Sequence, residues 1–315
     1  MLQTFSCRPR PNDGRIRLAS VAFGTLFVIG MSSAHAQLRY AGSDTVEPVV
    51  NAAQTAYARG HAGYKLQIQA SGTGPGIREL CTARAGLVGA SRPIKPDEAQ
   101  SCVSAGVQYV EVPVALDAVV LVVSAKNTWL KELTLAEART VFDPASAGKT
   151  ISWKQIRPGF PDVPIRPAGV GIKHGTFGFF TEAMGLKGFI RSDFKDLPDH
   201  AGTGRYVAGD VGAIGFMPIG EAQSLDGQVR KLGLDMGAGV VTPGAEEVSS
   251  GKYDKFARTV YLYVNPALLA KGSAQDIEFA KLLINDTEKF VRFAGLIPLR
   301  GLQYQENIKR VALGR

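Results

Sequence analysis

Three short segments of this 315-residue chain combine glycine with hydroxyl side chains, at residues 42–45 (Gly-Ser-Asp-Thr), 71–74 (Ser-Gly-Thr-Gly) and 175–176 (Gly-Thr). Each is expected at the start of a helix, where unpaired backbone N–H groups and the helix dipole favour an anion. An ordinary helix N-cap uses the same residue types. Three such segments in one chain, together with Ser91 and Arg92, favour a site for a small oxyanion.

Several familiar catalytic and cofactor motifs are absent from the sequence. Residues 72–76 lack the lysine of a P-loop, and residues 169–175 have the wrong glycine spacing for dinucleotide binding. No Gly-x-Ser-x-Gly segment marks a hydrolase nucleophile. Apart from one histidine near the N-terminus, the chain has His61, His174 and His200, and no pattern around them indicates a metal site or a Ser-His-Asp triad. We therefore expect no cofactor and no metal.

The N-terminus has the three parts of a secretory signal peptide. Four arginines precede a short apolar run at residues 18–31, and small residues ending in Ala-His-Ala follow at residues 32–36. The apolar run is shorter than the ~20 residues that a membrane-spanning helix needs, which makes a transmembrane anchor the weaker interpretation. We predict a signal peptide at residues 1–36, a mature chain from Gln37 and a periplasmic location.

The composition indicates a globular protein with an ordinary surface charge. Apolar residues make up 45% and charged residues 20% of the chain, and the formal net charge is +8. Residues 1–36 contain four arginines and one aspartate, so the mature chain keeps 32 basic and 27 acidic residues, a net charge of +5. The basic residues are scattered, without a basic run or interleaved aromatic residues. The charge therefore does not indicate a nucleic-acid surface.

The mature chain keeps two of the three cysteines, Cys81 and Cys102. In an oxidising compartment, two cysteines are typical of one disulfide. Two buried free thiols are the alternative, and the mass of the exported protein with and without reductant distinguishes the two.

Alternating strand-like and helix-like segments predict an α/β fold. The expected strands lie just before residue 42 and at residues 64–69, 87–90, 107–112, 114–124, 211–217 and 260–264. The expected helices lie at residues 46–57, capped by one of residues 43–45, from residue 77 through Cys81, and at residues 133–142, 177–184 and 275–293. The first three strands each end in a small-residue loop, and in α/β sheets ligands bind at that edge.

These segments carry a resemblance to the periplasmic phosphate-binding proteins of bacterial ABC transporters. The chain is most similar to the branch in which cysteines flank a Ser-Arg-Pro-Ile-Lys segment, here residues 91–95 between Cys81 and Cys102. Matching blocks follow in order and cover nearly all of residues 38–300; they include residues 112–118, 133–142, 151–158, 175–177 and 208–216.

The resemblance implies a two-lobe, type II periplasmic-binding fold with two crossing hinge strands. We place the crossings near residues 119–123 and 260–264, and the first of these explains the long apolar run that Asp117 interrupts. Lobe one would then contain residues 37–121 and 258–315, and lobe two residues 122–257. The ligand would lie in the cleft between the lobes, which close around it by hinge motion.

The resemblance also implies which residues bind phosphate. The positions that match the family's binding loops are Ser43, Thr45, Ser71, Gly72, Thr73, Ser91, Arg92, Gly175 and Thr176. Asp117 stands at the position of the family's hinge aspartate. Asp44, Lys173 and His174 stand in the same loops where the family has other residues, and we include them in the predicted site. Lys173 and His174 add positive charge, and Asp44 offers an acceptor for the proton of HPO4²⁻.

We therefore expect an exported, monomeric solute-binding protein that captures phosphate and delivers it to the permease of an ABC importer. The same fold with another oxyanion or a phosphate ester is an alternative, because residues 172–174 depart from the family pattern. A secreted phosphatase-like enzyme that uses Asp44 or His174 is another, and a ligandless signalling module is a third.

Overall fold

A large mixed sheet is the centre of the computed structural model, which describes residues 38–313. Its strands are β1 (Arg39–Gly42), β2 (Gln67–Ala70), β3 (Leu87–Ala90), β4 (Val110–Ser124), β6 (Arg166–Val170), β7 (Lys195–Leu197), β8 (Ala213–Pro218), β9 (Val229–Lys231), β12 (Ala257–Val264) and β13 (Ile297–Pro298). They join in the order β2-β1-β3-β12-β4-β8-β6-β7, with β9 and β13 also paired to β4. The predicted signal peptide at residues 1–36 lies outside the described residues.

A second, small sheet contains β5 (Glu132–Thr134), β10 (Gly233–Asp235) and β11 (Val240–Val241). The helices are α1 (Glu47–Ala58), α2 (Thr73–Cys81), α3 (Pro96–Ser104), α4 (Leu135–Phe142), α5 (Trp153–Ile156), α6 (Gly175–Ala183), α7 (His200–Gly209), α8 (Ile219–Ser224), α9 (Ala245–Ser249), α10 (Pro266–Ala270), α11 (Ala274–Asn285), α12 (Thr287–Phe293) and α13 (Gln303–Leu313). None of those within residues 38–313 is long and apolar enough to span a membrane. The predicted α/β fold class is confirmed.

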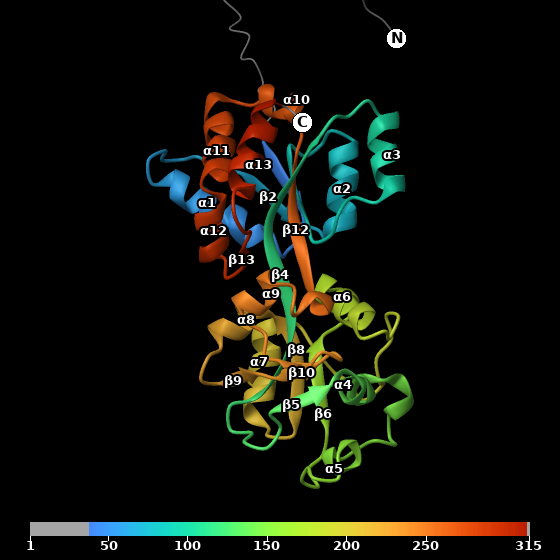
Figure 1. Cartoon of the computed structure of the whole chain (residues 1–315). Helices are drawn as coiled ribbons and strands as arrows, with labels where there is room; N and C mark the ends of the chain where they lie inside the picture. The colour runs from blue at the N-terminus through green and yellow to red at the C-terminus, as the bar shows by residue number, and fades with distance from the viewer. Residues whose placement is uncertain (1–37, 314–315) are drawn as a thin grey trace, which may run out of the picture. The chain divides into compact units, whose positions relative to one another are not determined.

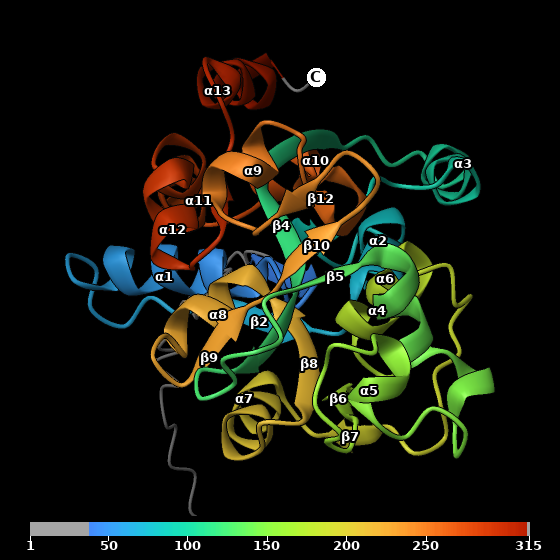
Figure 2. The ribbon, with the colours of Figure 1, turned by 60° about the horizontal axis from the view of Figure 1, so that its bottom comes forward.

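The helices gather on two parts of the large sheet (Figure 1). Helix α1 contacts α11 and α12 beside the β1–β3 part, and α7 contacts β6 and β8 at the other part. Strands β4 and β12 run antiparallel beside each other between these parts (Figure 2). The predicted disulfide is present and joins Cys81, the last residue of α2, to Cys102 in α3.

The first three strands form the predicted βαβαβ unit. Strand β1 pairs in parallel with both β2 and β3. The carboxyl ends of three parallel strands therefore meet at one edge of the sheet, and the loops after Gly42, Ala70 and Ala90 lie along it. Strand β2 is shorter than predicted because the Leu66 amide donates to the Gln54 side chain at 2.7 Å instead of joining the ladder.

Helix α1 buries the predicted apolar face of Val49, Val50, Ala53 and Tyr57, but its predicted cap is wrong. Its N-cap is Val46, which makes no side-chain capping bond. The Ser43 hydroxyl instead accepts a hydrogen bond from the Thr45 amide at 3.1 Å. The reason is a turn before the helix, in which the Ser43 carbonyl accepts from the amides of Val46 and Glu47.

Helices α2 and α6 begin earlier than predicted, at Thr73 and Gly175. Residues 72–76 precede the predicted helix start at residue 77, but Thr73, Gly74, Pro75 and Gly76 form the first turn of α2. The first turn of a helix has no intrahelical partner for its N–H groups, so a proline there removes no bond. Both glycine loops consequently present the amides of a helix N-terminus.

The two apolar runs at residues 107–112 and 114–124 form one strand, β4, instead of two. Pro113 is accommodated beside a shift in the register with β12, between Val260 and Tyr261. The first half of β4 contributes to one buried apolar cluster and residues 118–123 to another. Asp117 lies between the two clusters. The lobe limits at residues 121/122 and 257/258 stay a prediction.

The predicted long helix at residues 275–293 is two helices, α11 and α12, which meet at Asp286. Asn285, Asp286 and Thr287 are residues that favour helix ends over helix interiors because their side chains compete for backbone hydrogen bonds. The Thr287 hydroxyl donates to the Leu283 and Ile284 carbonyls, which satisfies the end of α11.

Glycine is required where β1, α2 and β3 approach closely. Gly42 has φ +114°, and a Cβ placed there would lie 2.2 Å from the Gly89 carbonyl oxygen. We expect Gly42→Ala to lower the free energy of unfolding by about 3 kcal/mol, from strain and overpacking together. Gly63→Ala is the matched control, since Gly63 has φ +88° but a Cβ placed there would have no neighbouring atom within 4 Å. Urea unfolding curves measure both, and equal losses would contradict the role assigned to the close approach.

Candidate functional site

A cavity of about 550 Å³ lies at the carboxyl ends of β1, β2, β3 and β6. Nine of the predicted site residues line it: Asp44, Ser71, Gly72, Thr73, Ser91, Arg92, Lys173, His174 and Gly175. Ala70, Gly74, Phe179, Glu182 and Arg258 complete the lining. Segments far apart in the sequence, from Asp44 to Gly175, therefore face one space.

Four predicted site residues do not line this cavity. Ser43 is buried, and its amide donates to the Gly89 carbonyl at 2.8 Å while its carbonyl accepts from the Tyr40 hydroxyl at 2.7 Å. Thr45 and Thr176 line a neighbouring cavity of about 420 Å³. Asp117 is fully buried and does not itself line the cavity. It forms an ion pair with Arg258, which does line it. Ser43 is held in place by the close packing of β1 on β3.

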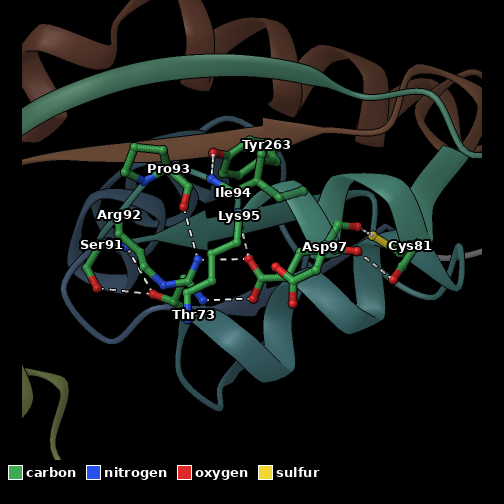
Figure 3. Close-up of polar contacts among 11 residues, drawn as sticks. Thr73, Cys81, Ser91, Arg92, Pro93, Ile94, Lys95, Asp97 and Tyr263 are labelled. Carbon is green, nitrogen blue, oxygen red and sulfur yellow. Dashed lines mark hydrogen bonds and ion pairs between the residues drawn. The ribbon is translucent and has the colours of Figure 1, made fainter.

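The loops after β2 and β3 are joined by a pair of hydroxyls (Figure 3). The Ser91 amide donates to Thr73 Oγ1 at 3.0 Å, and the two side-chain oxygens lie 3.1 Å apart. Thr73 is the first residue of α2, so this contact holds the helix N-terminus against the start of the Ser-Arg-Pro-Ile-Lys segment. One donor of the hydroxyl pair remains for a bound anion, because each hydroxyl has a single proton.

Arg92 lines the cavity with its guanidinium held by a carboxylate. Its Nη1 and Nη2 atoms donate to Glu98 Oε2 and Oε1, both at 2.8 Å. These hydrogen bonds lower the pKa of Glu98 and raise the pKa of Arg92, so both groups stay charged. The Arg92 and Glu98 side chains are 33% and 17% exposed.

Arg258, which is not among the predicted site residues, also lines the cavity. Its Nε and Nη2 atoms donate to Asp117 Oδ2 at 3.1 and 3.0 Å, and Nη2 also lies 3.2 Å from Thr45 Oγ1. The Arg258 side chain is 9% exposed and stacks on the Phe179 ring at 4.7 Å. Of its five N–H donors, the two on Nη1 remain for a ligand.

The register of β12 and β4 creates this pair, because it places Arg258 opposite Asp117. Burial raises the pKa of Asp117, and the positive charge of Arg258 opposes that rise. The sequence contained a signal for the pair: each strand predicted to cross between the lobes has one charged residue in or beside its apolar run, and the two charges are opposite.

The loop before α6 contributes Lys173 and His174 to the cavity. Within residues 38–313, Lys173 makes no ion pair. The His174 amide donates to the Gly171 carbonyl at 3.0 Å, which forms a turn, and Gly175 then begins α6. Ile172, which precedes Lys173 in this loop, is 79% exposed. Three cationic side chains (Arg92, Lys173 and Arg258) thus line the cavity with two acidic ones, Asp44 and Glu182.

His200 is a second residue near the site that is not among the predicted site residues. It lines the neighbouring cavity with Asp44, His174 and Thr176. Its Nε2 lies 3.4 Å from Thr176 Oγ1, and its buried Nδ1 has no hydrogen-bond partner within the described part of the chain. Burial, together with the neighbouring His174, lowers the pKa of His200 to about 4, although Asp44 and Asp199 oppose the shift and Arg258 adds to it.

The depressed pKa of His200 predicts a loss of stability in acid. Between pH 6.5 and about 4 the unfolded chain binds a proton at this histidine and the folded chain does not, so the free energy of unfolding falls as the pH falls through this window. We expect His200 to account for up to about 3 kcal/mol of that fall. Unfolding curves of the wild type and His200→Gln between pH 7 and 4 isolate this contribution. Parallel pH dependences for the two proteins would contradict it.

Comparison with known proteins identifies relatives along most of the chain. A family model described as a PBP superfamily domain matches residues 30–286. Protein SphX of Synechocystis sp. is 33% identical over 259 residues, which cover 82% of this chain and 77% of SphX. The phosphate-binding protein PstS of Staphylococcus epidermidis is 26% identical over 81% of this chain and 77% of its own length.

Solved structures show the same fold. A possible phosphate binding protein from Planctomyces limnophilus has a TM-score of 0.70 and 27% identity, and the match covers 88% of this chain and 98% of that one. A putative phosphate ABC transporter substrate-binding protein from Clostridium perfringens, solved with bound phosphate, has a TM-score of 0.63 and 24% identity over 84% of this chain and 100% of that one. The resemblance inferred from the sequence blocks is confirmed. The chain belongs to the PBP superfamily and has the type II periplasmic-binding fold.

Proposed function

We propose that this protein captures phosphate in the cavity that Arg92 and Arg258 line, and delivers it to the permease of an ABC importer. The observation that carries the proposal is the convergence of helix N-termini and cations on one space. The amides that begin α2 and α6, the hydroxyls of Ser71, Thr73 and Ser91, and three cationic side chains surround it. A cavity lined by so many hydrogen-bond donors and cations suits a small polyanion.

Asp44 gives this site a means of selecting phosphate. Its carboxylate lines the cavity among the cations. A carboxylate only accepts hydrogen bonds, so it pairs with the proton of HPO4²⁻ and repels sulfate, which has no proton at neutral pH. We expect Asp44→Asn to lower the ratio of phosphate affinity to sulfate affinity, as measured by calorimetric titration with each anion.

The proposal includes an exported, monomeric protein with two lobes that close on the ligand. The lobes follow the predicted limits, residues 37–121 and 258–315 against residues 122–257. The periplasmic location rests on the signal sequence, and cleavage is expected before Gln37. The PBP superfamily membership and the similarity to a transporter substrate-binding protein support capture and release rather than catalysis or nucleic-acid binding.

Isothermal calorimetry on the mature protein tests the proposal, with phosphate and sulfate titrated separately after extensive dialysis. We expect saturable binding of one phosphate, with sulfate binding much weaker. The absence of both a heat signal and a thermal shift at millimolar phosphate would refute phosphate capture. Small-angle scattering with and without phosphate tests closure, for which we expect a smaller radius of gyration in the bound form.

A phosphate ester is the second candidate ligand, favoured by the positive charge and exposure of the loop that contains Lys173 and His174. A chromogenic phosphate ester in the same titration distinguishes the candidates, because its binding and its turnover are measured together. We expect weaker binding than for phosphate and no release of the chromophore. Turnover that depends on Asp44 or His174 would instead support a phosphatase-like enzyme.

A further inference from the structure

We propose that Glu98, which does not line the cavity, is a positioning residue that orients Arg92 toward the bound anion. The inference rests on the proposed capture of phosphate and names a residue that determines its affinity. It follows from three observations: the donors that Arg92 has left, the way α3 is held, and a matched ion pair elsewhere in the chain.

The hydrogen bonds of Arg92 leave one edge of its guanidinium available. A guanidinium has five N–H donors. Nη1 donates both to Glu98 Oε2 at 2.8 Å and to the Pro93 carbonyl at 3.0 Å, and Nη2 donates to Glu98 Oε1 at 2.8 Å (Figure 3). Three donors are therefore used, and the N–H of Nε and the second N–H of Nη2 remain. These two are parallel, which is the arrangement that binds two oxygens of one oxyanion.

The carboxylate that orients Arg92 is itself held in place. Glu98 Oε2 also accepts from the Lys95 amide at 2.9 Å, which ties the carboxylate to the start of α3. The disulfide joins α3 to α2, and Cys81 Sγ lies 3.4 Å from the Glu98 carbonyl oxygen.

The other end of the Arg92 segment is held as well. The Ile94 amide donates to the Tyr263 hydroxyl at 2.7 Å (Figure 3). That hydroxyl in turn donates to Glu111 at 2.6 Å. The segment 91–98 is thus fixed to α2 and β12, and Arg92 has little freedom to turn away from the cavity.

A second ion pair, between Glu137 and Arg157, has the same kind of geometry but lies outside the cavity. Glu137 binds Arg157 through two hydrogen bonds of 2.8 and 2.7 Å, and it also accepts from the Thr134 amide at the start of α4. The Arg157 and Glu137 side chains are 36% and 20% exposed, which is close to the exposures of Arg92 and Glu98. Neither residue lines the cavity. Glu137→Gln therefore reproduces the structural cost of Glu98→Gln without touching the proposed site.

The test is calorimetric titration of the mature protein with inorganic phosphate in four variants: Glu98→Gln, Glu98→Asp, Glu137→Gln and Arg92→Ala. We expect phosphate affinity to fall roughly tenfold in Glu98→Gln, the equivalent of one lost hydrogen bond. Glu98→Asp keeps the charge but draws the carboxylate back by one carbon, and roughly a threefold loss is expected. Glu137→Gln should bind like the wild type and show a loss in melting temperature similar to that of Glu98→Gln.

A double-variant cycle separates positioning from a general structural effect. If Glu98 acts through Arg92, adding Glu98→Gln to Arg92→Ala changes phosphate affinity by less than twofold. If Glu98→Gln lowered phosphate affinity in the Arg92→Ala background as much as in the wild type, the positioning role would be overturned.

Two other results would also overturn it. One is unchanged phosphate binding in both Glu98 variants. The other is tighter phosphate binding in Glu98→Gln, which would mean that Glu98 competes with the anion for Arg92. Failure of the wild type to bind phosphate would instead refute the proposed function and this inference with it.

Discussion

Arg258→Met is expected to weaken phosphate binding by about 100-fold and to lower the free energy of unfolding by about 3 kcal/mol. The loss of affinity follows from the two Nη1 donors, since two hydrogen bonds from a charged group are together worth about 3 kcal/mol or more. The loss of stability follows from Asp117, which is fully buried and would have no cation beside it. Calorimetry and urea unfolding measure the two effects separately.

The loss of stability in the Arg258→Met variant should also depend on pH. Burial already raises the pKa of Asp117, and removal of Arg258 takes away the charge that opposes the rise. An acid whose pKa is higher in the folded state stabilises the fold below its unfolded pKa and loses that stabilisation as the pH rises through the folded pKa. The stability deficit should therefore be largest at neutral pH and should shrink toward pH 4.

Two control variants make the Arg258 result interpretable. Arg166→Met removes an exposed ion pair with Asp210, in which the side chains are 53% and 38% exposed, and should cost under about 1 kcal/mol. The double variant Arg258→Met/Asp117→Leu replaces both charges with apolar groups and should recover most of the stability but none of the phosphate affinity. Full phosphate affinity in either Arg258 variant would show that Arg258 does not touch the ligand.

Removal of the disulfide is expected to destabilise the protein about as much as Arg258→Met does. Cys81 and Cys102 are 21 residues apart in the sequence, and closing a loop of that length restricts the unfolded chain by roughly 3 kcal/mol in the chain-entropy model. We expect the variant Cys81→Ala/Cys102→Ala to lose about that much free energy of unfolding. Alanine is chosen because both sites are buried and a serine hydroxyl there would add its own cost.

Urea unfolding of this variant, beside the wild type with and without reductant, measures the effect. Reductant should lower the unfolding midpoint of the wild type and leave the variant unchanged. Coincident curves for the wild type and the variant, each with and without reductant, would mean that the bridge constrains the unfolded chain far less than expected. The same variant should also bind phosphate more weakly if the anchoring of α3 matters to Arg92.

Most of the local structure could be predicted because it depends on neighbouring residues. The alternation of strands and helices in residues 38–90 follows from periodicity, and the strand at residues 87–90 has the predicted limits. The helix predicted at residues 133–142 is also present as α4, which begins after Thr134, whose Oγ1 accepts from the Glu137 amide at 3.2 Å. The errors lie at element ends, where Pro75 at the first turn of α2 and Asp286 between two helices have locally ambiguous roles.

The candidate site was predictable to the extent that its residues follow the ends of parallel strands. Spacing alone places Asp44, Ser71, Thr73, Ser91 and Arg92 after β1, β2 and β3, and the sheet then brings these loops to one edge. The glycine-rich composition of these loops is likewise a local property, because glycine permits both the positive φ of Gly42 and its contact with β3.

The two ion pairs that orient the cavity's arginines could not be obtained in this way. Arg258 and Asp117 are separated by 141 residues, and they meet because β12 and β4 pair in one register out of several that their apolar residues would permit. The direction of the Arg92 head depends on how α3 folds back to bring Glu98 beside it. Local sequence sets which residues are available at the ends of strands. Register and packing between distant segments set which of them face the cavity, because those contacts form only when the whole sheet is assembled.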